Sequence, residues 1–170
     1  MELITRSTYL NHIVNLLDRG SIIILTGQRR VGKSFMLKQV HEWIKSNIPS
    51  ANVLYVNKEL HAFRHITDSD SLYEYVDVRL TKGGRNYLLI DEVQDIDGYE
   101  NALRSLQAED RCQIIATGSN AYVFSKELGT RLAGRYVEIP IHSLDYEEFL
   151  KFHHLDDSDA SLLLYLRVGG

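Results

Sequence analysis

The residues of this chain best suited to chemistry lie in one short stretch, from Gly27 to Ser34, that reads Gly-x-x-x-x-Gly-Lys-Ser. Glycines at these positions let the backbone curl until several N–H groups point inward and form a nest for an anion. The Lys33 ammonium can reach the β- and γ-phosphates of a nucleotide, and the Ser34 hydroxyl can ligate Mg²⁺. The stretch therefore predicts a phosphate-binding loop, or P-loop. The residues expected to form it are Gly27, Gln28, Arg29, Arg30, Val31, Gly32, Lys33, Ser34 and Phe35.

A pair of adjacent carboxylates, Asp91 and Glu92, follows a short apolar run at residues 87–90. Ligands of open α/β sheets bind at the carboxyl ends of the strands, so a buried strand that delivers two carboxylates there has a functional pattern. Together with a P-loop the pair makes a Walker B element. Asp91 is expected to hold Mg²⁺ with Ser34, and Glu92 to act as the general base on the attacking water. The alternative is an ordinary acidic turn after a strand.

Three polar residues and two arginines complete the candidate catalytic set. Thr117, Ser119 and Asn120 follow the fourth apolar run, where a polar side chain can sense the γ-phosphate or orient the water, and Asn120 is the candidate that we select. Arg131 and Arg135 lie in a glycine-bearing segment and could supply an arginine finger, in cis or to a neighbouring subunit. We favour Arg135. The alternative for both arginines is exposure to solvent or pairing with a carboxylate.

Five apolar runs, predicted to be strands, must position these residues. The first, at residues 22–25, leads directly into the P-loop, and a helical pattern follows the loop. Strands that alternate with helices predict an α/β fold with a parallel sheet, and right-handed crossovers place helices on both of its faces. The strands are expected at 22–25, 53–56, 87–90, 113–116 and 136–141, and the helices at 7–19, from the loop to 46, at 71–80, 97–110, 121–128, 146–152 and 160–168.

Length and composition favour a cytoplasmic globular domain. The 170 residues fit one domain, and a formal net charge of −4 weighs against broad nucleic-acid binding without excluding a local basic strip. Cys112 is the single cysteine, so an intrachain disulfide is excluded and a reducing compartment is expected. The first ten residues do not form a signal peptide, and no apolar run is long enough to span a membrane.

Several motifs together resemble a known family. The segments TGQRRVGKS, LLIDEVQ, ATGSN, LAGR and SLDYEEFL are similar to those of AAA_14, a bacterial and archaeal ATPase domain of the AAA+ type. The resemblance covers about residues 5–170. It implies an additional-strand P-loop NTPase (ASCE) core with strand order 5-1-4-3-2, with ATP and Mg²⁺ as cofactors. It also implies that ATP lies on Gly27 to Ser34 and that Asp91 and Glu92 take the metal and water roles.

The same resemblance implies how the chain is organised. A core is expected over residues 1–150, and residues 151–170 are expected to begin a helical C-terminal region that continues in the family. In that family the ATPase domain is commonly followed by a DUF4143 domain. The chain is therefore expected to be the ATPase half of a longer protein, with the C-terminal domain as a partner.

Four functions remain open from the sequence. The first is an ATPase that hydrolyses ATP to drive a conformational change, and the second is a nucleotide-gated switch with little turnover. The third is a small-molecule kinase, although paired carboxylates at a strand end suit water activation better. The fourth is a nucleic-acid motor, for which the scattered basic residues form no basic-aromatic array. A homo-oligomer is possible, and no protein client can be named.

Overall fold

The computed structural model describes residues 5–119, 132 and 134–169. Its centre is a sheet of five parallel strands in the order β2-β3-β4-β1-β5, which is the predicted order 5-1-4-3-2 read from the other edge. The prediction of the sheet is therefore confirmed, including the insertion of β4 between β1 and β3. The strands are β1 Ile22–Thr26, β2 Asn52–Asn57, β3 Asn86–Asp91, β4 Gln113–Thr117 and β5 Tyr136–Pro140.

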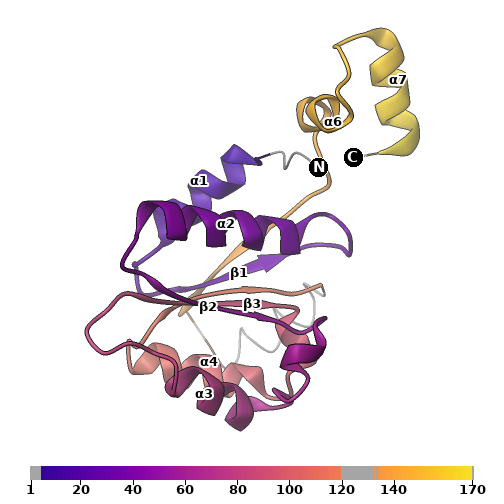
Figure 1. Cartoon of the computed structure of the whole chain (residues 1–170). Helices are drawn as coiled ribbons and strands as arrows, with labels where there is room; N and C mark the ends of the chain where they lie inside the picture. Colours follow the sequence, from indigo (N-terminus) through magenta and orange to yellow (C-terminus); the bar gives the residue numbers. More distant parts are fainter. Residues whose placement is uncertain (1–4, 120–131, 133, 170) are drawn as a thin grey trace.

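Helices cover both faces of the sheet, as Figure 1 shows: α1 and α2 lie on one face, and α3 and α4 on the other. The last two helices, α6 and α7, form a hairpin set apart from the sheet. None of the helices within the described ranges is both long and apolar enough to cross a membrane. The helices are α1 Ser7–Leu16, α2 Lys33–Asn47, α3 Ser69–Asp77, α4 Tyr99–Ala108, α6 Tyr146–His153 and α7 Asp159–Val168, with short 3-10 helices at His61–Phe63 and Val93–Asp95.

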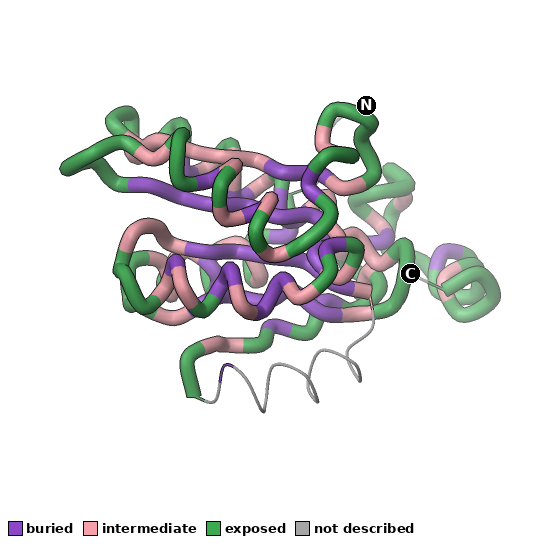
Figure 2. The backbone as a smooth tube through the Cα atoms, turned by 90° about the horizontal axis from the view of Figure 1, so that it is seen from below, coloured by how far each residue is buried: buried purple, intermediate pink, exposed green. Residues whose placement is uncertain are grey.

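The central strands are apolar on both faces because helices cover both faces. Successive side chains of a strand point to opposite faces, so Ile22 and Ile24 pack toward α3 and α4, whereas Ile23 and Leu25 pack toward α1 and α2. All five residues of β1 are buried, and the buried segments in Figure 2 run through the middle of the molecule. This packing holds the end of β1, and with it the P-loop, in place.

Some helix boundaries differ from those expected. The helix predicted at 7–19 ends at Leu16, because Leu17 is extended and Asp18 has a φ of 58°. The helix predicted at 71–80 spans Ser69–Asp77, because the Asp68 side chain caps it by accepting a hydrogen bond from the Ser71 N–H. The helix predicted at 121–128 lies outside the described residues.

Candidate nucleotide-binding site

The P-loop connects the end of β1 to the start of α2 through backbone conformations that glycine favours. Gly27 has a φ of 143° and Gly32 a φ of 98°, and Arg30 between them also has a positive φ of 70°. A Cβ on Gly27 would lie 2.3 Å from the Ile141 carbonyl oxygen, so only glycine fits against the end of β5. Helix α2 begins at Lys33, and its free N–H groups and dipole add to the attraction for an anion.

Lys33 lies against the loop and is only 4% exposed. Its Nζ donates hydrogen bonds to the carbonyl oxygens of Gly27, at 3.0 Å, and Gln28, at 2.9 Å. An ammonium has three N–H donors, so these two bonds leave one for a phosphate oxygen. Burial lowers the pKa of Lys33, while the nearby carboxylates of Glu92 and Asp91 oppose that shift. The loop therefore contains a partly desolvated cation close to the two carboxylates that follow β3.

Asp91 is fully buried and connects the P-loop to β4. Its Oδ1 accepts hydrogen bonds from Ser34 Oγ, at 3.0 Å, and from Thr117 Oγ1, at 2.6 Å. Its Oδ2 has no hydrogen-bond partner among the described residues. A buried carboxylate oxygen without a partner is costly, and Mg²⁺ is usually bound by one or two protein oxygens together with substrate phosphates. Ser34 and Asp91 therefore fit a shared magnesium ion.

Glu92 faces the same loop from the turn after β3. Its φ of 56° is left-handed, and its N–H donates to Thr117 Oγ1 at 2.9 Å. Its carboxylate accepts hydrogen bonds from Ser119 Oγ, at 2.9 and 2.8 Å, and from the Gln94 side-chain amide. Glu92 lines a cavity of about 700 Å³, and its other lining residues are Arg29, Arg30, Gly32, Lys33, Ser34, Phe35, Lys38 and Glu59.

The family model of AAA_14, an AAA domain, matches residues 19–150, which include the P-loop and both carboxylates. The chain belongs to the AAA_14 family. An uncharacterised protein of Haemophilus influenzae is 34% identical over 174 aligned residues, which cover 99% of this AAA_14 chain and 44% of the H. influenzae protein. An uncharacterised protein of Methanocaldococcus jannaschii is 28% identical, with 92% of this chain and 34% of that protein covered. The chain thus spans less than half the length of these relatives.

Solved structures show the same fold as the AAA_14 chain. The ORC1 protein of Aeropyrum pernix in complex with DNA has a TM-score of 0.62 at 15% identity, over 98% of this chain and 56% of ORC1. AMPPCP-bound DnaA from Aquifex aeolicus has a TM-score of 0.56 at 19% identity, over 98% and 58%. Hsp104 of S. cerevisiae in complex with casein has a TM-score of 0.65 at 16% identity, over 89% and 29%. At these identities the likeness shows an AAA+ P-loop NTPase fold.

The other candidate residues of the AAA_14 chain are not all near the P-loop. Arg135 is exposed, and its carbonyl accepts a hydrogen bond from the Ile22 N–H at 3.0 Å, at the start of β1. The P-loop follows the carboxyl end of β1, whereas Arg135 lies beside its amino end. Arg135 therefore does not reach its own P-loop. Its alternative role, toward a neighbouring subunit, stays a prediction. Asn120 and Arg131 lie outside the described residues.

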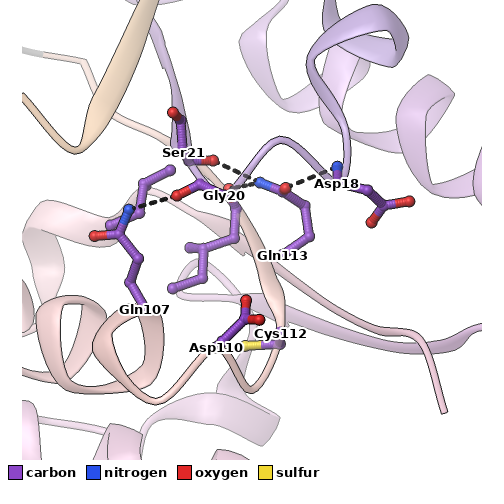
Figure 3. A pocket seen from close by; sticks show the side chains of 9 residues that line it. Asp18, Gly20, Ser21, Gln107, Asp110, Cys112 and Gln113 are labelled. Carbon is purple, nitrogen blue, oxygen red and sulfur yellow. Dashed lines mark hydrogen bonds between the residues drawn. The ribbon is translucent and has the colours of Figure 1, made fainter.

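A smaller polar cavity of about 240 Å³ lies where β1 and β4 begin, at the end of the sheet opposite the P-loop, and is shown in Figure 3. The side-chain amides of Gln107 and Gln113 donate to the backbone carbonyls of Gly20 and Ser21, respectively, and Gln113 Oε1 accepts from the Asp18 N–H. These hydrogen bonds therefore connect α4 and β4 to the segment that precedes β1. We assign this cavity a structural role.

Sequence reasoning missed two contacts that support the site. The Gln94 side-chain amide donates a hydrogen bond to the Glu92 carboxylate. The presence of a polar residue shortly after the acidic pair could have indicated this contact. Arg6 donates a hydrogen bond to the carbonyl of Val31 inside the P-loop at 3.2 Å, and no local pattern marks this contact. Thr117, one of the three sensor candidates, joins Asp91 to the backbone of Glu92.

The close approach at Gly27 gives a direct prediction. Gly27→Ala should destabilise the domain by about 2–4 kcal/mol, because a Cβ would require both an unfavourable φ and a displacement of the Ile141 carbonyl. Gly83→Ala is the matched control: Gly83 has a φ of 74° but nothing within 4 Å of the added Cβ, so only about 1 kcal/mol is expected. Urea unfolding measures both values. Equal stability of the two variants would contradict the close approach.

Proposed function

We propose that this AAA_14 domain binds ATP together with Mg²⁺ and hydrolyses the ATP to drive a conformational change. The observation that carries the proposal is the pair of Ser34 Oγ and the buried Asp91 carboxylate, 3.0 Å apart at the mouth of the P-loop. Asp91 Oδ2, which has no hydrogen-bond partner among the described residues, supports a cation there. The analogue-bound DnaA neighbour, whose ligand is AMPPCP, supports a nucleoside triphosphate as the ligand of this fold.

In this proposal the P-loop residues bind the phosphates. The inward N–H groups of the loop donate to phosphate oxygens, and the third Lys33 N–H donates to the β- and γ-phosphates. Ser34 and Asp91 hold Mg²⁺, which supplies positive charge for the negative charge that develops during phosphoryl transfer. Thr117 fixes the Asp91 carboxylate by donating to its Oδ1. The result is a pre-organised site at the carboxyl edge of the sheet.

Glu92 is proposed as the general base. Its carboxylate lines the cavity in front of the P-loop, where it can take a proton from a water that attacks the γ-phosphate. Ser119 and Gln94 donate hydrogen bonds to that carboxylate and so set its direction. We favour transfer to water over transfer to a small-molecule acceptor, because a pair of carboxylates at a strand end suits water activation better.

Phosphate release from MgATP tests this function. Wild type is expected to release phosphate with MgATP, and chelation of the metal by EDTA should reduce the rate at least about a hundredfold, because the charge on the phosphates is no longer neutralised. ATP binding without phosphate release would favour the switch, in which the nucleotide is held as a signal. Strong stimulation by DNA or RNA would instead favour a nucleic-acid motor.

We also propose that Arg135 acts on a neighbouring copy of the domain as an arginine finger. Its exposure at the edge opposite its own P-loop suits a contact in trans. Arg135→Ala should lower turnover by about a thousandfold, and addition of Glu92→Gln subunits, which retain Arg135, should partly restore it. Unchanged turnover of Arg135→Ala at concentrations where the wild-type chain self-associates would contradict this role.

The proposal extends to the longer relatives. The hairpin of α6 and α7 exposes several apolar side chains, including Leu163 and Leu166. We propose that residues 1–150 are the nucleotide-binding core and that residues 151–170, which include the end of α6 and all of α7, begin a helical region that responds to the nucleotide. A difference in protease sensitivity of the hairpin with and without MgATP would support that division, and identical cleavage patterns would contradict it.

A further inference from the structure

Arg6 is a buried cation with an unusually complete set of partners. Its side chain is 4% exposed. Its Nε and one terminal nitrogen donate to the two carboxylate oxygens of Glu148, at 2.9 Å each. The guanidinium also donates to the carbonyl oxygens of Val31, at 3.2 Å, His142, at 2.9 Å, and Ser143, at 3.3 Å. One side chain therefore joins the P-loop, the segment between β5 and α6, and α6 itself.

The bond to Val31 bears on the anion nest. The Val31 carbonyl and the Gly32 N–H belong to one planar trans peptide, in which the C=O and N–H groups point in opposite directions. A donor that holds the Val31 carbonyl therefore also fixes the direction of the Gly32 N–H. Gly32 is the second glycine of the P-loop and lines the candidate nucleotide cavity. Arg6 thus acts on the nest through the Val31 carbonyl, on the opposite side of the peptide from the Gly32 N–H, and does not itself need to touch the ligand.

The bond to Glu148 bears on the hairpin. Glu148 lies in the first turn of α6, and its carboxylate accepts a hydrogen bond from the Asp145 N–H at 3.1 Å. The Asp145 side chain in turn accepts from the Glu148 N–H at 2.8 Å, which completes a capping box. The Glu148 carboxylate therefore both takes part in the N-terminal capping box of α6 and pairs with Arg6. A movement of Glu148 displaces both the start of the hairpin and the guanidinium behind the P-loop.

We propose that Arg6 is a positioning residue that orients the Gly32 N–H toward a bound phosphate and, through Glu148, couples phosphate binding to the α6–α7 hairpin. This inference rests on the proposed nucleotide site for the identity of the ligand. Because coupling between two sites is reciprocal, a phosphate that orders the loop must stabilise the hairpin, and a change in the hairpin must alter phosphate affinity by the same factor.

Two variants test the coupling, and a third is their control. Arg6→Lys keeps the charge but loses the forked geometry that serves a carboxylate and several carbonyls at once. Glu148→Gln removes the charge but keeps an oxygen that can cap α6. Arg111→Lys is the matched control, because Arg111 pairs with Asp77 and Glu109 on the surface, away from the P-loop.

The probe is ATPγS with Mg²⁺, and the measurements are calorimetric affinity and amide hydrogen exchange. In wild type, ATPγS is expected to slow exchange of residues 146–168 by at least about threefold. Arg6→Lys should bind ATPγS about tenfold more weakly and should lose that protection, because charged hydrogen bonds in a buried site are lost. Glu148→Gln should show about a threefold loss of affinity and the same loss of protection. Arg111→Lys should behave as wild type.

Wild-type affinity together with wild-type protection in Arg6→Lys would overturn the inference. Where Arg6→Lys does not fold, Glu148→Gln gives the same test. If wild type does not bind ATPγS at all, the proposed function fails. The coupling is then tested by hydrogen exchange of the protein without ligand. In that case faster exchange of residues 28–34 in Glu148→Gln supports the coupling, and unchanged exchange there overturns it.

Discussion

Replacement of Lys33 by alanine is expected to weaken MgATP binding by about a hundredfold, which corresponds to about 2.7 kcal/mol. The variant loses a charge-assisted hydrogen bond from a nearly buried ammonium to the phosphates. It also loses the two bonds by which Lys33 holds the carbonyls of Gly27 and Gln28, so the loop becomes less well ordered before the nucleotide arrives. Calorimetric titration of MgATP measures the change.

The effect on folding should be smaller than the effect on binding. Burial lowers the pKa of Lys33, which means that the charged side chain is itself costly in the folded chain. Its removal relieves that cost and offsets part of the loss of two hydrogen bonds, so the melting temperature should change by only a few degrees. Lys38→Ala is the matched control, because Lys38 is exposed at the rim of the same cavity. Its affinity should change less than about threefold. Equal affinities of wild type and Lys33→Ala would contradict a phosphate role for Lys33.

Glu92→Gln should separate turnover from binding. The amide is isosteric but a very weak base, so hydrolysis is expected to fall by about 10²- to 10⁴-fold. Affinity for MgATP should stay within about threefold of wild type, because the amide oxygen can still accept the hydrogen bond from Ser119. Single-turnover phosphate release and equilibrium titration give the two values.

Glu59→Gln is the control for this second prediction. Glu59 lines the same cavity, but it is exposed and follows β2, so its loss should leave turnover within about threefold of wild type. Retention of turnover in Glu92→Gln would show that another group activates the water. A parallel loss of affinity would show that Glu92 acts in binding and not as the base.

The sequence predicted the sheet and the P-loop because both depend on local patterns. The run at residues 22–25 is apolar throughout, which is typical of a strand covered on both faces, and the motif that follows it has fixed positions for two glycines, a lysine and a serine. The strand order was implied by family resemblance and not by periodicity. The proximity of Ser34 and Asp91 follows from that order, because the carboxyl ends of parallel strands share one edge.

The position of Arg135 could have been reasoned more closely from the sequence. Arg135 directly precedes a predicted strand, and a residue that precedes a strand of a parallel sheet lies at the amino edge, opposite the P-loop. A contact with its own P-loop was therefore disfavoured at the outset. The role of Arg6 could not be reasoned in this way. Its side-chain partners lie 25 to 142 positions along the chain, so only the folded structure brings them together.

The most direct test of the central claim is a crystal structure of the domain with Mg²⁺ and a non-hydrolysable ATP analogue. The account predicts a triphosphate on the N–H groups of residues 27–34, with Lys33 Nζ donating to it. It also predicts one magnesium ion that binds Ser34 Oγ and, directly or through water, the Asp91 carboxylate. An analogue bound elsewhere, or an ion that contacts neither Ser34 nor Asp91, would contradict the account.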